Sequence, residues 1–201
     1  PEMTQMGHGQ RAEDANLGLG ALYHGLARAL RPARAVVIGS WRGFVPIVLA
    51  KALSENLEGG EVVFIDPSMV DDFWRDASRV KSWFDRFDIV NIRHYCLTTQ
   101  EFAQTQDYAN LGPVGLLYVD GMHTFEQARI DFECFRSKLT SEAVVLFHDS
   151  ARVRSSSIYG TDRPYEHRVK DYMEVLRLDP GLEVFSLPVA DGVTLVRQRD
   201  Q

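Results

Sequence analysis

Short, continuously apolar segments alternate with longer amphipathic segments along most of this 201-residue chain. The short segments are rich in Val, Ile, Leu and Phe, and their apolar residues follow one another instead of alternating with polar ones. Strands of this kind are typical of a parallel sheet that is covered by helices on both faces. We expect such strands at 36–38, 62–65, 89–92, 115–119 and 144–147.

The longer segments have the three- and four-residue spacing of helices that bury one face. We expect helices at 13–30, 44–53, 70–84, 125–139 and 165–178. Thr98 is followed by Glu101, and Thr124 by Gln127, which is the capping-box pattern of a helix start. Both starts come soon after a predicted strand, so strand and helix alternate.

The C-terminal segment departs from this alternation. Two strand-like runs, 182–187 and 193–197, are joined by a connection that contains Asp191-Gly192, a hairpin signal. This order predicts an α/β fold: a Rossmann-like, doubly wound, mostly parallel seven-stranded sheet with an antiparallel C-terminal hairpin. We expect residues 1–201 to form a single domain, with an N-terminal segment and helix at 1–30. The connection 151–164 is either a lid or an ordinary solvated loop.

Composition and charge exclude several classes of partner. The chain has 22 Lys and Arg against 28 Asp and Glu, a net charge of −6, and no long basic run, which argues against nucleic-acid binding. Its apolar runs are too short for a membrane span, and its first thirty residues lack the layout of a secretory signal. Cys96 and Cys134 form no paired motif, so we expect reduced thiols and a cytoplasmic protein.

A glycine-containing loop follows the first predicted strand. Gly39 allows a tight turn there, and Gly43 lets the next helix approach a ligand closely, with Ser40 and Trp41 between them. The spacing G-x-x-x-G differs from the G-x-G-x-x-G of a dinucleotide site, which disfavours NAD and FAD. The loop is therefore either a cofactor-binding loop or a structural turn with two glycines.

An acidic residue, Asp66, ends the second predicted strand, 27 residues after Gly39. A carboxylate in this place can accept hydrogen bonds from both hydroxyls of a ribose, although it can also be a plain helix-start residue. Ser68 follows it, and Thr98 and Thr99 follow the third strand, where polar contacts to an adenine are expected. These residues predict a cofactor that contains adenosine with a free ribose.

Four ionisable residues follow two further strands. Asp120 and His123 come after the fourth strand, and His148 and Asp149 after the fifth. In an open α/β sheet the carboxyl ends of the strands meet at one edge, so we expect these side chains to share one cleft. A buried core would not tolerate so many ionisable groups without partners, which favours a functional site.

Together these features resemble the class I S-adenosylmethionine-dependent methyltransferases over residues 30–198. The stretch Asp-Gly-x-His-x-Phe-Glu from Asp120, followed by His-Asp after the fifth strand, is similar to one branch. That branch contains macrolide-sugar O-methyltransferases and cephalosporin-hydroxylase-like proteins. The resemblance implies that Asp120 and Asp149 bind a divalent metal, that His123 is the catalytic base, and that His148 stands where some relatives have a second carboxylate.

Two positions depart from the pattern of these relatives. Val37 replaces an acidic residue that often contacts the amino-acid end of the cofactor, so this contact must come from elsewhere. An imidazole at His148 weakens the case for Mg and favours Mn, and action without a metal is a further alternative.

We therefore expect an S-adenosylmethionine-dependent O-methyltransferase that acts on the hydroxyl of a small molecule, such as a sugar or natural product. His123 and Asp120 would be catalytic, and the chain would act alone or as a homodimer. The alternatives are a hydroxylase-like enzyme on the same scaffold and a non-catalytic cofactor-binding subunit. Met3, Met6 and His8 either cover the cleft or belong to a mobile end. His167 could face the cleft, but a surface position is expected.

Overall fold

The computed structural model describes residues 6–199. The two ends of the expected domain, 1–5 with Met3 and 200–201, lie outside the described residues. The strands are β1 (Arg34–Ile38), β2 (Glu61–Ile65), β3 (Ile92–Tyr95), β4 (Val114–Val119), β5 (Leu139–His148), β6 (Arg154–Ser156), β7 (Tyr165–His167), β8 (Leu182–Leu187) and β9 (Val193–Gln198). The helices are α1 (Leu19–Leu30), α2 (Phe44–Glu55), the 3₁₀ helix η2 (Phe73–Arg75), α3 (Ala77–Asp85), α4 (Thr99–Phe102), α5 (Gln106–Ala109), α6 (Phe125–Arg136) and α7 (Val169–Arg177).

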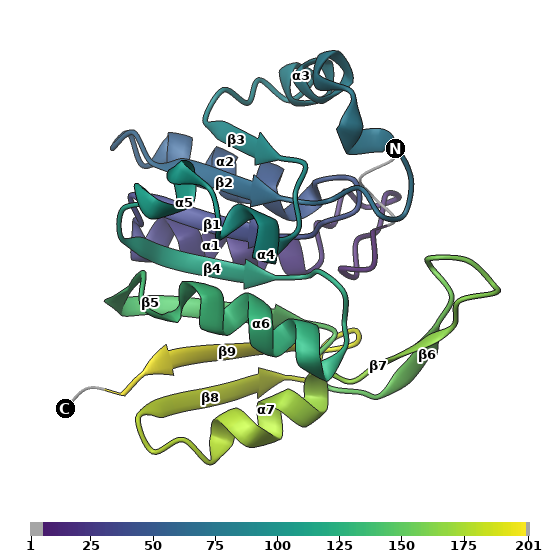
Figure 1. The fold of residues 1–201 in the computed structure, drawn as a ribbon. Coiled ribbons are helices and arrows are strands. Elements are labelled where there is room, and N and C mark those ends of the chain that lie inside the picture. The colour runs from purple at the N-terminus through teal and green to yellow at the C-terminus, as the bar shows by residue number, and fades with distance from the viewer. Residues whose placement is uncertain (1–5, 200–201) are drawn as a thin grey trace.

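Seven strands form one sheet in the order β3-β2-β1-β4-β5-β9-β8 (Figure 1). The first five are parallel neighbours, and β9 lies antiparallel to both β5 and β8. The strand order reverses between β1 and β4, which is where ligands bind in open α/β sheets. The predicted fold, including the seven-stranded sheet and the C-terminal hairpin, is confirmed.

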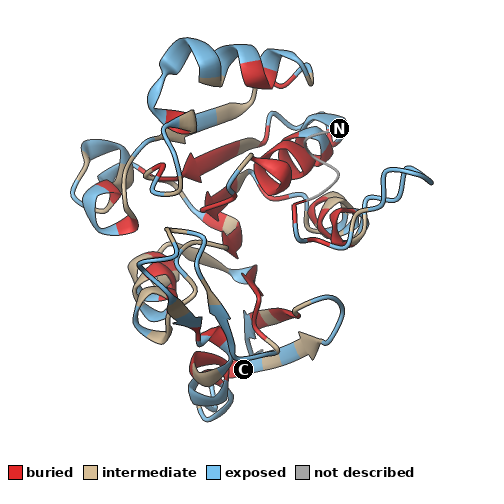
Figure 2. Ribbon diagram, turned by 90° about the vertical axis from the view of Figure 1, so that its right-hand side faces the viewer, coloured by how far each residue is buried: buried red, intermediate tan, exposed pale blue. Residues whose placement is uncertain are grey.

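The two faces of the sheet are covered by different helices. Alternate strand residues point to opposite faces, so Val37 packs with α1, α2 and α3, whereas Val36 packs with α4, α6 and α7. In Figure 2 the buried residues run through the central strands and the helix faces turned toward them. Of the described helices, none is long and apolar enough to cross a bilayer.

Several predicted boundaries are wrong. The expected helix at 70–84 is divided into η2 and α3, because Asp76 between them is extended and caps α3, and the expected helix at 125–139 ends at Arg136, since Leu139 begins β5. The third strand is Ile92–Tyr95 and not 89–92, because Ile89 packs against the end of α3 while β3 lies at the sheet edge, where polar residues are tolerated. The first helix begins at Leu19 and not at residue 13. Gly18 precedes it with φ +55°, and a side chain on Gly18 would collide with the carbonyl oxygen of His8.

A further correction concerns the segment after β5. The expected helix 165–178 is divided into strand β7 and helix α7, and β7 pairs with β6 in an antiparallel hairpin. This hairpin, residues 154–167, projects beyond the carboxyl edge of the sheet (Figure 1). It takes in most of the expected lid or loop at 151–164, and we name it the β6–β7 arm.

Candidate active site

A cavity of about 610 Å³ lies at the carboxyl ends of β1, β2, β4 and β5. Its size suits a bound cofactor or drug-sized ligand. Eleven of the twelve predicted site residues line it: Gly39, Ser40, Trp41, Asp66, Ser68, Thr98, Thr99, Asp120, His123, His148 and Asp149. Gly43 does not. Gly43 precedes α2 with φ +82°, and a Cβ there would lie 3.0 Å from the ring of Trp74. A glycine at this position therefore allows the close packing of Trp74 and does not contact a ligand in the cavity.

The loop after β1 is held by a backbone contact at Gly39 and by two hydrogen bonds of Ser40. Gly39 has φ +68°, and a Cβ on it would approach the Asp120 carbonyl oxygen to 2.3 Å. Only glycine therefore allows the backbone after β1 to lie against the backbone after β4. The Ser40 amide donates to Asp66 Oδ2 at 3.3 Å, and the Val45 amide donates to Ser40 Oγ, also at 3.3 Å.

Asp66 is buried beneath this loop. Its Oδ1 accepts from the Ser68 amide at 2.8 Å, and its Oδ2 faces Ser40. Burial raises the pKa of Asp66 to about 6, even though both amides favour the ionised form. The carboxylate is thus held in place by backbone donors while it lines the cavity.

The polar residues after β3 form the side of the cavity next to α6. Thr98 caps α4 in a full capping box with Glu101, as predicted. Thr124 caps α6, while the Gln127 side chain donates to Asp131 instead of completing a second box. Thr99 Oγ1 donates to the same Asp131 oxygen at 2.6 Å, which fixes Thr99 at the cavity wall.

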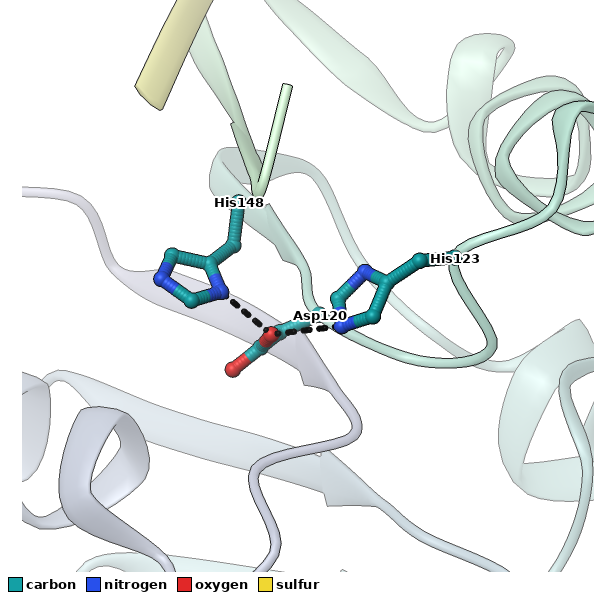
Figure 3. Close-up of side chains that lie close together, drawn as sticks. All are labelled: Asp120, His123 and His148. Atoms are coloured by element: carbon teal, nitrogen blue, oxygen red, sulfur yellow. Dashed lines mark hydrogen bonds and ion pairs between the residues drawn. The ribbon is translucent and has the colours of Figure 1, made fainter. Parts of the chain in front are cut away.

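Asp120 lies between two imidazoles (Figure 3). His148 Nδ1 is 2.8 Å and His123 Nε2 is 3.6 Å from Asp120 Oδ1. His123 Nε2 is also 3.7 Å from Asp149 Oδ2, and His148 Nδ1 is 3.4 Å from Asp149 Oδ1. The four residues that follow β4 and β5 therefore meet in one cluster, at the edge of the sheet where the sequence places them.

The two imidazoles of this cluster differ in protonation. Burial lowers the pKa of His123 to about 3, so it is neutral at physiological pH. Burial also disfavours charge on His148, but the carboxylates of Asp120 and Asp149 outweigh it and raise its pKa to about 9. His148 is therefore a cation, and His123 an unprotonated base.

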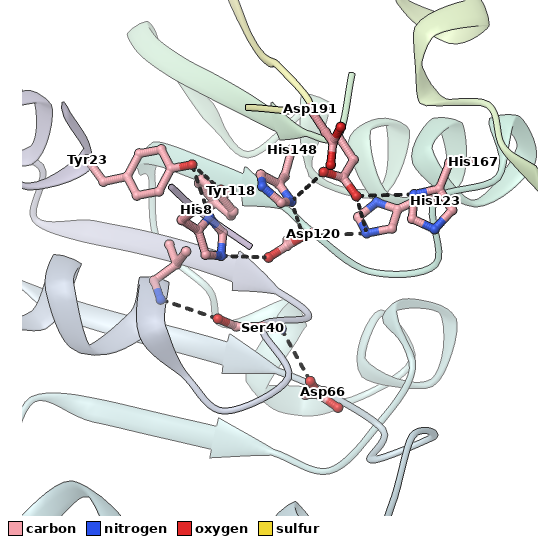
Figure 4. Close-up of polar contacts among 12 residues, drawn as sticks. His8, Tyr23, Ser40, Asp66, Tyr118, Asp120, His123, His148, His167 and Asp191 are labelled. Carbon is pink, nitrogen blue, oxygen red and sulfur yellow. Dashed lines mark hydrogen bonds and ion pairs between the residues drawn. The ribbon is translucent and has the colours of Figure 1, made fainter. Parts of the chain in front are cut away.

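Three residues join this cluster that the sequence did not assign to it. His167, expected at the surface, is buried on β7 with Nδ1 3.1 Å from Asp149 Oδ2. Arg154 on β6 contacts the same oxygen through Nη2. His8 is buried between Phe44 and His148, and its Nε2 is 3.8 Å from Asp120 Oδ2 (Figure 4).

A chain of buried hydroxyls lies behind His8. The Tyr118 hydroxyl donates to Tyr23 Oη at 2.7 Å, and Tyr23 Oη lies 3.3 Å from His8 Nδ1 (Figure 4). If Tyr23 donates to Nδ1, the proton of His8 is on Nε2 and faces Asp120. The N-terminal segment, with Met6 and His8 lining the cavity, thus covers the cleft, which was one of the two alternatives expected from the sequence.

The metal set implied by the resemblance is already occupied by protein cations. Asp120 accepts a hydrogen bond from His148, and Asp149 accepts one from Arg154. Two groups, Asp120–His123–His148 and His123–Asp149–His167, have potential ligand atoms within 4.8 Å of one another. Binding of an ion by Asp120, His148 and Asp149 would require loss of these pairs, so this set does not fit a magnesium ion, which prefers oxygen ligands.

Comparison with known proteins gives a family and a fold. A family model described as a methyltransferase domain matches residues 36–150. Among curated proteins, the uncharacterized protein y4gI of Sinorhizobium fredii is 30% identical over 130 residues, which are 62% of this chain. The chain spans 14% of the length of that relative.

Solved structures resemble nearly the whole chain. The Podospora anserina methyltransferase PaMTH1, bound to SAH, has a TM-score of 0.68 and 17% identity, covering 99% of this chain and 87% of its own. The O-methyltransferase TomG of Streptomyces achromogenes, which is involved in tomaymycin synthesis and bound to SAM, has a TM-score of 0.67 and 19% identity, covering 99% and 88%. At these identities the likeness shows the fold.

Proposed function

Because the chain belongs to the methyltransferase domain family, we propose that it transfers a methyl group from S-adenosylmethionine to a hydroxyl of a small molecule. The observation that carries this proposal is one shared cavity: Asp66 and the Asp120–His123–His148–Asp149 cluster line the same space of about 610 Å³. SAM- and SAH-bound O-methyltransferases of the same fold support the choice of cofactor.

The cofactor would lie along the loop after β1. Asp66 would accept hydrogen bonds from the ribose hydroxyls, since its carboxylate is fixed at the cavity wall by the Ser40 and Ser68 amides. Thr98 and Thr99 would contact the adenine beside α4. Gly39, Ser40 and Trp41 line the cavity next to Asp120, so they would contact the part of the cofactor that is nearest the reaction cluster.

S-adenosylmethionine supplies a methyl group on a sulfonium, which leaves a neutral thioether when it is displaced. The harder task is to remove a proton from the acceptor hydroxyl. His123 is neutral, so its Nε2 can accept this proton, and Asp120 and Asp149, 3.6 and 3.7 Å away, would offset part of the cost of burying the imidazolium that forms. The proton thus moves from the acceptor oxygen to His123 Nε2 as the new C–O bond forms.

A sugar or another natural product remains the acceptor that we propose, in agreement with the branch that the motif resembles. The cytoplasmic location, the homodimer and the absence of nucleic-acid and membrane partners stay predictions from the sequence.

The proposal is tested first by binding and then by product mass. We expect the wild-type chain to bind S-adenosylhomocysteine in a calorimeter and the Asp66→Ala variant to lose this binding. With methyl-labelled S-adenosylmethionine and a panel of hydroxylated small molecules, the product should gain one methyl group. No binding by the wild type would contradict the proposal. A gain of one oxygen would indicate the hydroxylase-like alternative, and binding without turnover of any acceptor would indicate a cofactor-binding subunit.

A further inference from the structure

Arg154 brings a permanent positive charge into the reaction cluster. It begins β6, its Nη2 contacts Asp149 Oδ2, and its Nε lies 3.7 Å from Asp191 Oδ2. Arg154 lines the cavity, and its side chain is 41% exposed there, whereas the Asp149 side chain is only 4% exposed. A guanidinium has five N–H donors, more than these two contacts use.

The β6–β7 arm delivers two residues to one carboxylate. Arg154 and His167 are directly opposite each other in the antiparallel ladder, and both contact Asp149 Oδ2. His123 Nε2, the proton acceptor of the proposed reaction, is 3.7 Å from the same oxygen. The guanidinium therefore stands beside the place where the acceptor oxygen would lose its proton.

A buried carboxylate needs a partner that offsets the loss of its hydration. In the relatives that the motif resembles, a divalent metal would have this role. In this chain, Arg154 neutralises Asp149, and the hydrogen bond from His148 satisfies Asp120. The position that would hold a second carboxylate ligand is itself the imidazole of His148.

We propose that Arg154 takes the place of a catalytic metal ion, and that its guanidinium stabilises the negative charge that develops on the acceptor oxygen during methyl transfer. This inference rests on the proposed function. The acceptor proton passes to His123 Nε2, the oxygen forms a bond to the methyl carbon, and the C–S bond breaks with its electron pair on sulfur. Arg154 keeps all its protons, because a guanidinium is not deprotonated in proteins. No metal ion is needed for this balance.

Metal binding tests the first half of the inference without any acceptor or cofactor. The full chain is stripped with a chelator and titrated with Mn(II), followed by calorimetry and by the electron paramagnetic resonance signal of the free ion. We expect no saturable Mn(II) site in the wild type. Arg154→Ala removes the cation from Asp149, so it should gain a site that binds Mn(II) at least about 10-fold more tightly than the wild type does.

Two further variants control this result. Arg152→Ala removes an exposed arginine two residues away and should behave like the wild type. Arg154→Lys keeps the positive charge, so it should also show no Mn(II) site. Arg154→Gln removes the charge and keeps most of the side-chain volume, so it replaces Arg154→Ala if that variant does not fold. A tight one-to-one Mn(II) site in the wild type, or no gain in a folded Arg154→Ala variant, would overturn the inference.

Turnover tests the second half. Arg154→Gln should bind S-adenosylhomocysteine as the wild type does and lose roughly 10²–10³-fold in kcat, the usual effect of removing one group that stabilises a developing oxyanion. Wild-type turnover should persist after chelation. Turnover that needs added metal, or normal kcat in Arg154→Gln, would refute the role of Arg154. Failure of the wild type to bind S-adenosylhomocysteine would instead contradict the proposed function alone.

Discussion

Replacing Asp66 by Asn should stabilise the folded chain at neutral pH while it weakens cofactor binding. Burial raises the pKa of Asp66 from 3.8 to about 6. Each pKa unit corresponds to about 1.4 kcal/mol, so ionised Asp66 costs the folded state about 3 kcal/mol relative to its protonated form. Asn has no charge to bury, but its side-chain NH2 group would face the Ser40 N–H, so two donors would meet without an acceptor. This loss of a hydrogen bond reduces the expected gain in stability. We expect Asp66→Asn to increase the free energy of unfolding by about 1–2 kcal/mol at pH 7.5.

The sign of the pH dependence follows from the direction of the shift. The folded chain holds the Asp66 proton more tightly than the unfolded chain does, so this group lowers the stability of the wild type as pH rises from about 4 to about 6. The variant lacks this titration. Its advantage should therefore be full above pH 6 and disappear below pH 4.

Cofactor affinity should change in the opposite direction. In Asp66→Asn the side-chain amide would keep one oxygen acceptor and lose one charge-assisted hydrogen bond to the ribose, which is worth roughly 1.5–3 kcal/mol. S-adenosylhomocysteine should therefore bind about 10–100-fold more weakly.

Urea unfolding across this pH range and calorimetry with S-adenosylhomocysteine measure the two effects in the same samples. Asp76→Asn is the matched control, because Asp76 caps α3 away from the cavity and Asn caps a helix equally well. It should leave the binding of S-adenosylhomocysteine unchanged, and it should not stabilise the chain at pH 7.5, because hydrogen bonds from Ser78 and Arg79 hold the pKa of Asp76 below its usual value. If Asp66→Asn destabilises the chain equally at pH 7.5 and pH 4, burial does not strain the carboxylate and the reasoning is refuted.

Two further predictions concern the base and the hydroxyl chain behind the site. His123→Ala should keep its affinity for S-adenosylhomocysteine and lose roughly 10²–10⁴-fold in turnover, the usual contribution of a general base; unchanged turnover would show that another group takes the proton. Tyr23→Phe leaves the fully buried Tyr118 hydroxyl without its acceptor, so it should lower the free energy of unfolding by about 1–3 kcal/mol. The double variant with Tyr118→Phe should recover part of that loss in urea unfolding, and strictly additive losses would speak against the coupling.

The sequence is sufficient to predict the sheet and the residues that its strands deliver. Continuous apolar strands specify a covered parallel sheet, and the carboxyl ends of such strands share one edge. Asp66, Asp120 and Asp149 directly follow strands, so their meeting in one cavity depends on strand order alone. The prediction misplaces β3 because an edge strand is only partly buried, and hydrophobicity marks it weakly.

The sequence does not assign Arg154 and His167 to the site, and it gives His8 there only as one of two alternatives, because all three reach the site through tertiary contacts without a local signal. His8 comes from an irregular N-terminal segment, which crosses Gly18 closely enough to exclude any side chain there. Arg154 and His167 reach Asp149 because β6 and β7 pair with each other. Strand β7 has only three residues, too few to show the two-residue alternation of a strand, so the sequence merges it with the helix that follows. The spacing of Arg154 and His167 in the sequence therefore does not predict that both side chains contact Asp149.

The contact between Gly39 and the Asp120 carbonyl has a consequence for how this protein can diversify. The backbone after β1, which would hold the methyl donor, lies directly against the backbone after β4, which leads to the proposed base His123. These two segments therefore move together. Their separation is set by the backbone and is the same whichever molecule arrives. Adaptation to a new acceptor must therefore come from the two segments that do not share this joint, the N-terminal stretch and the projecting arm.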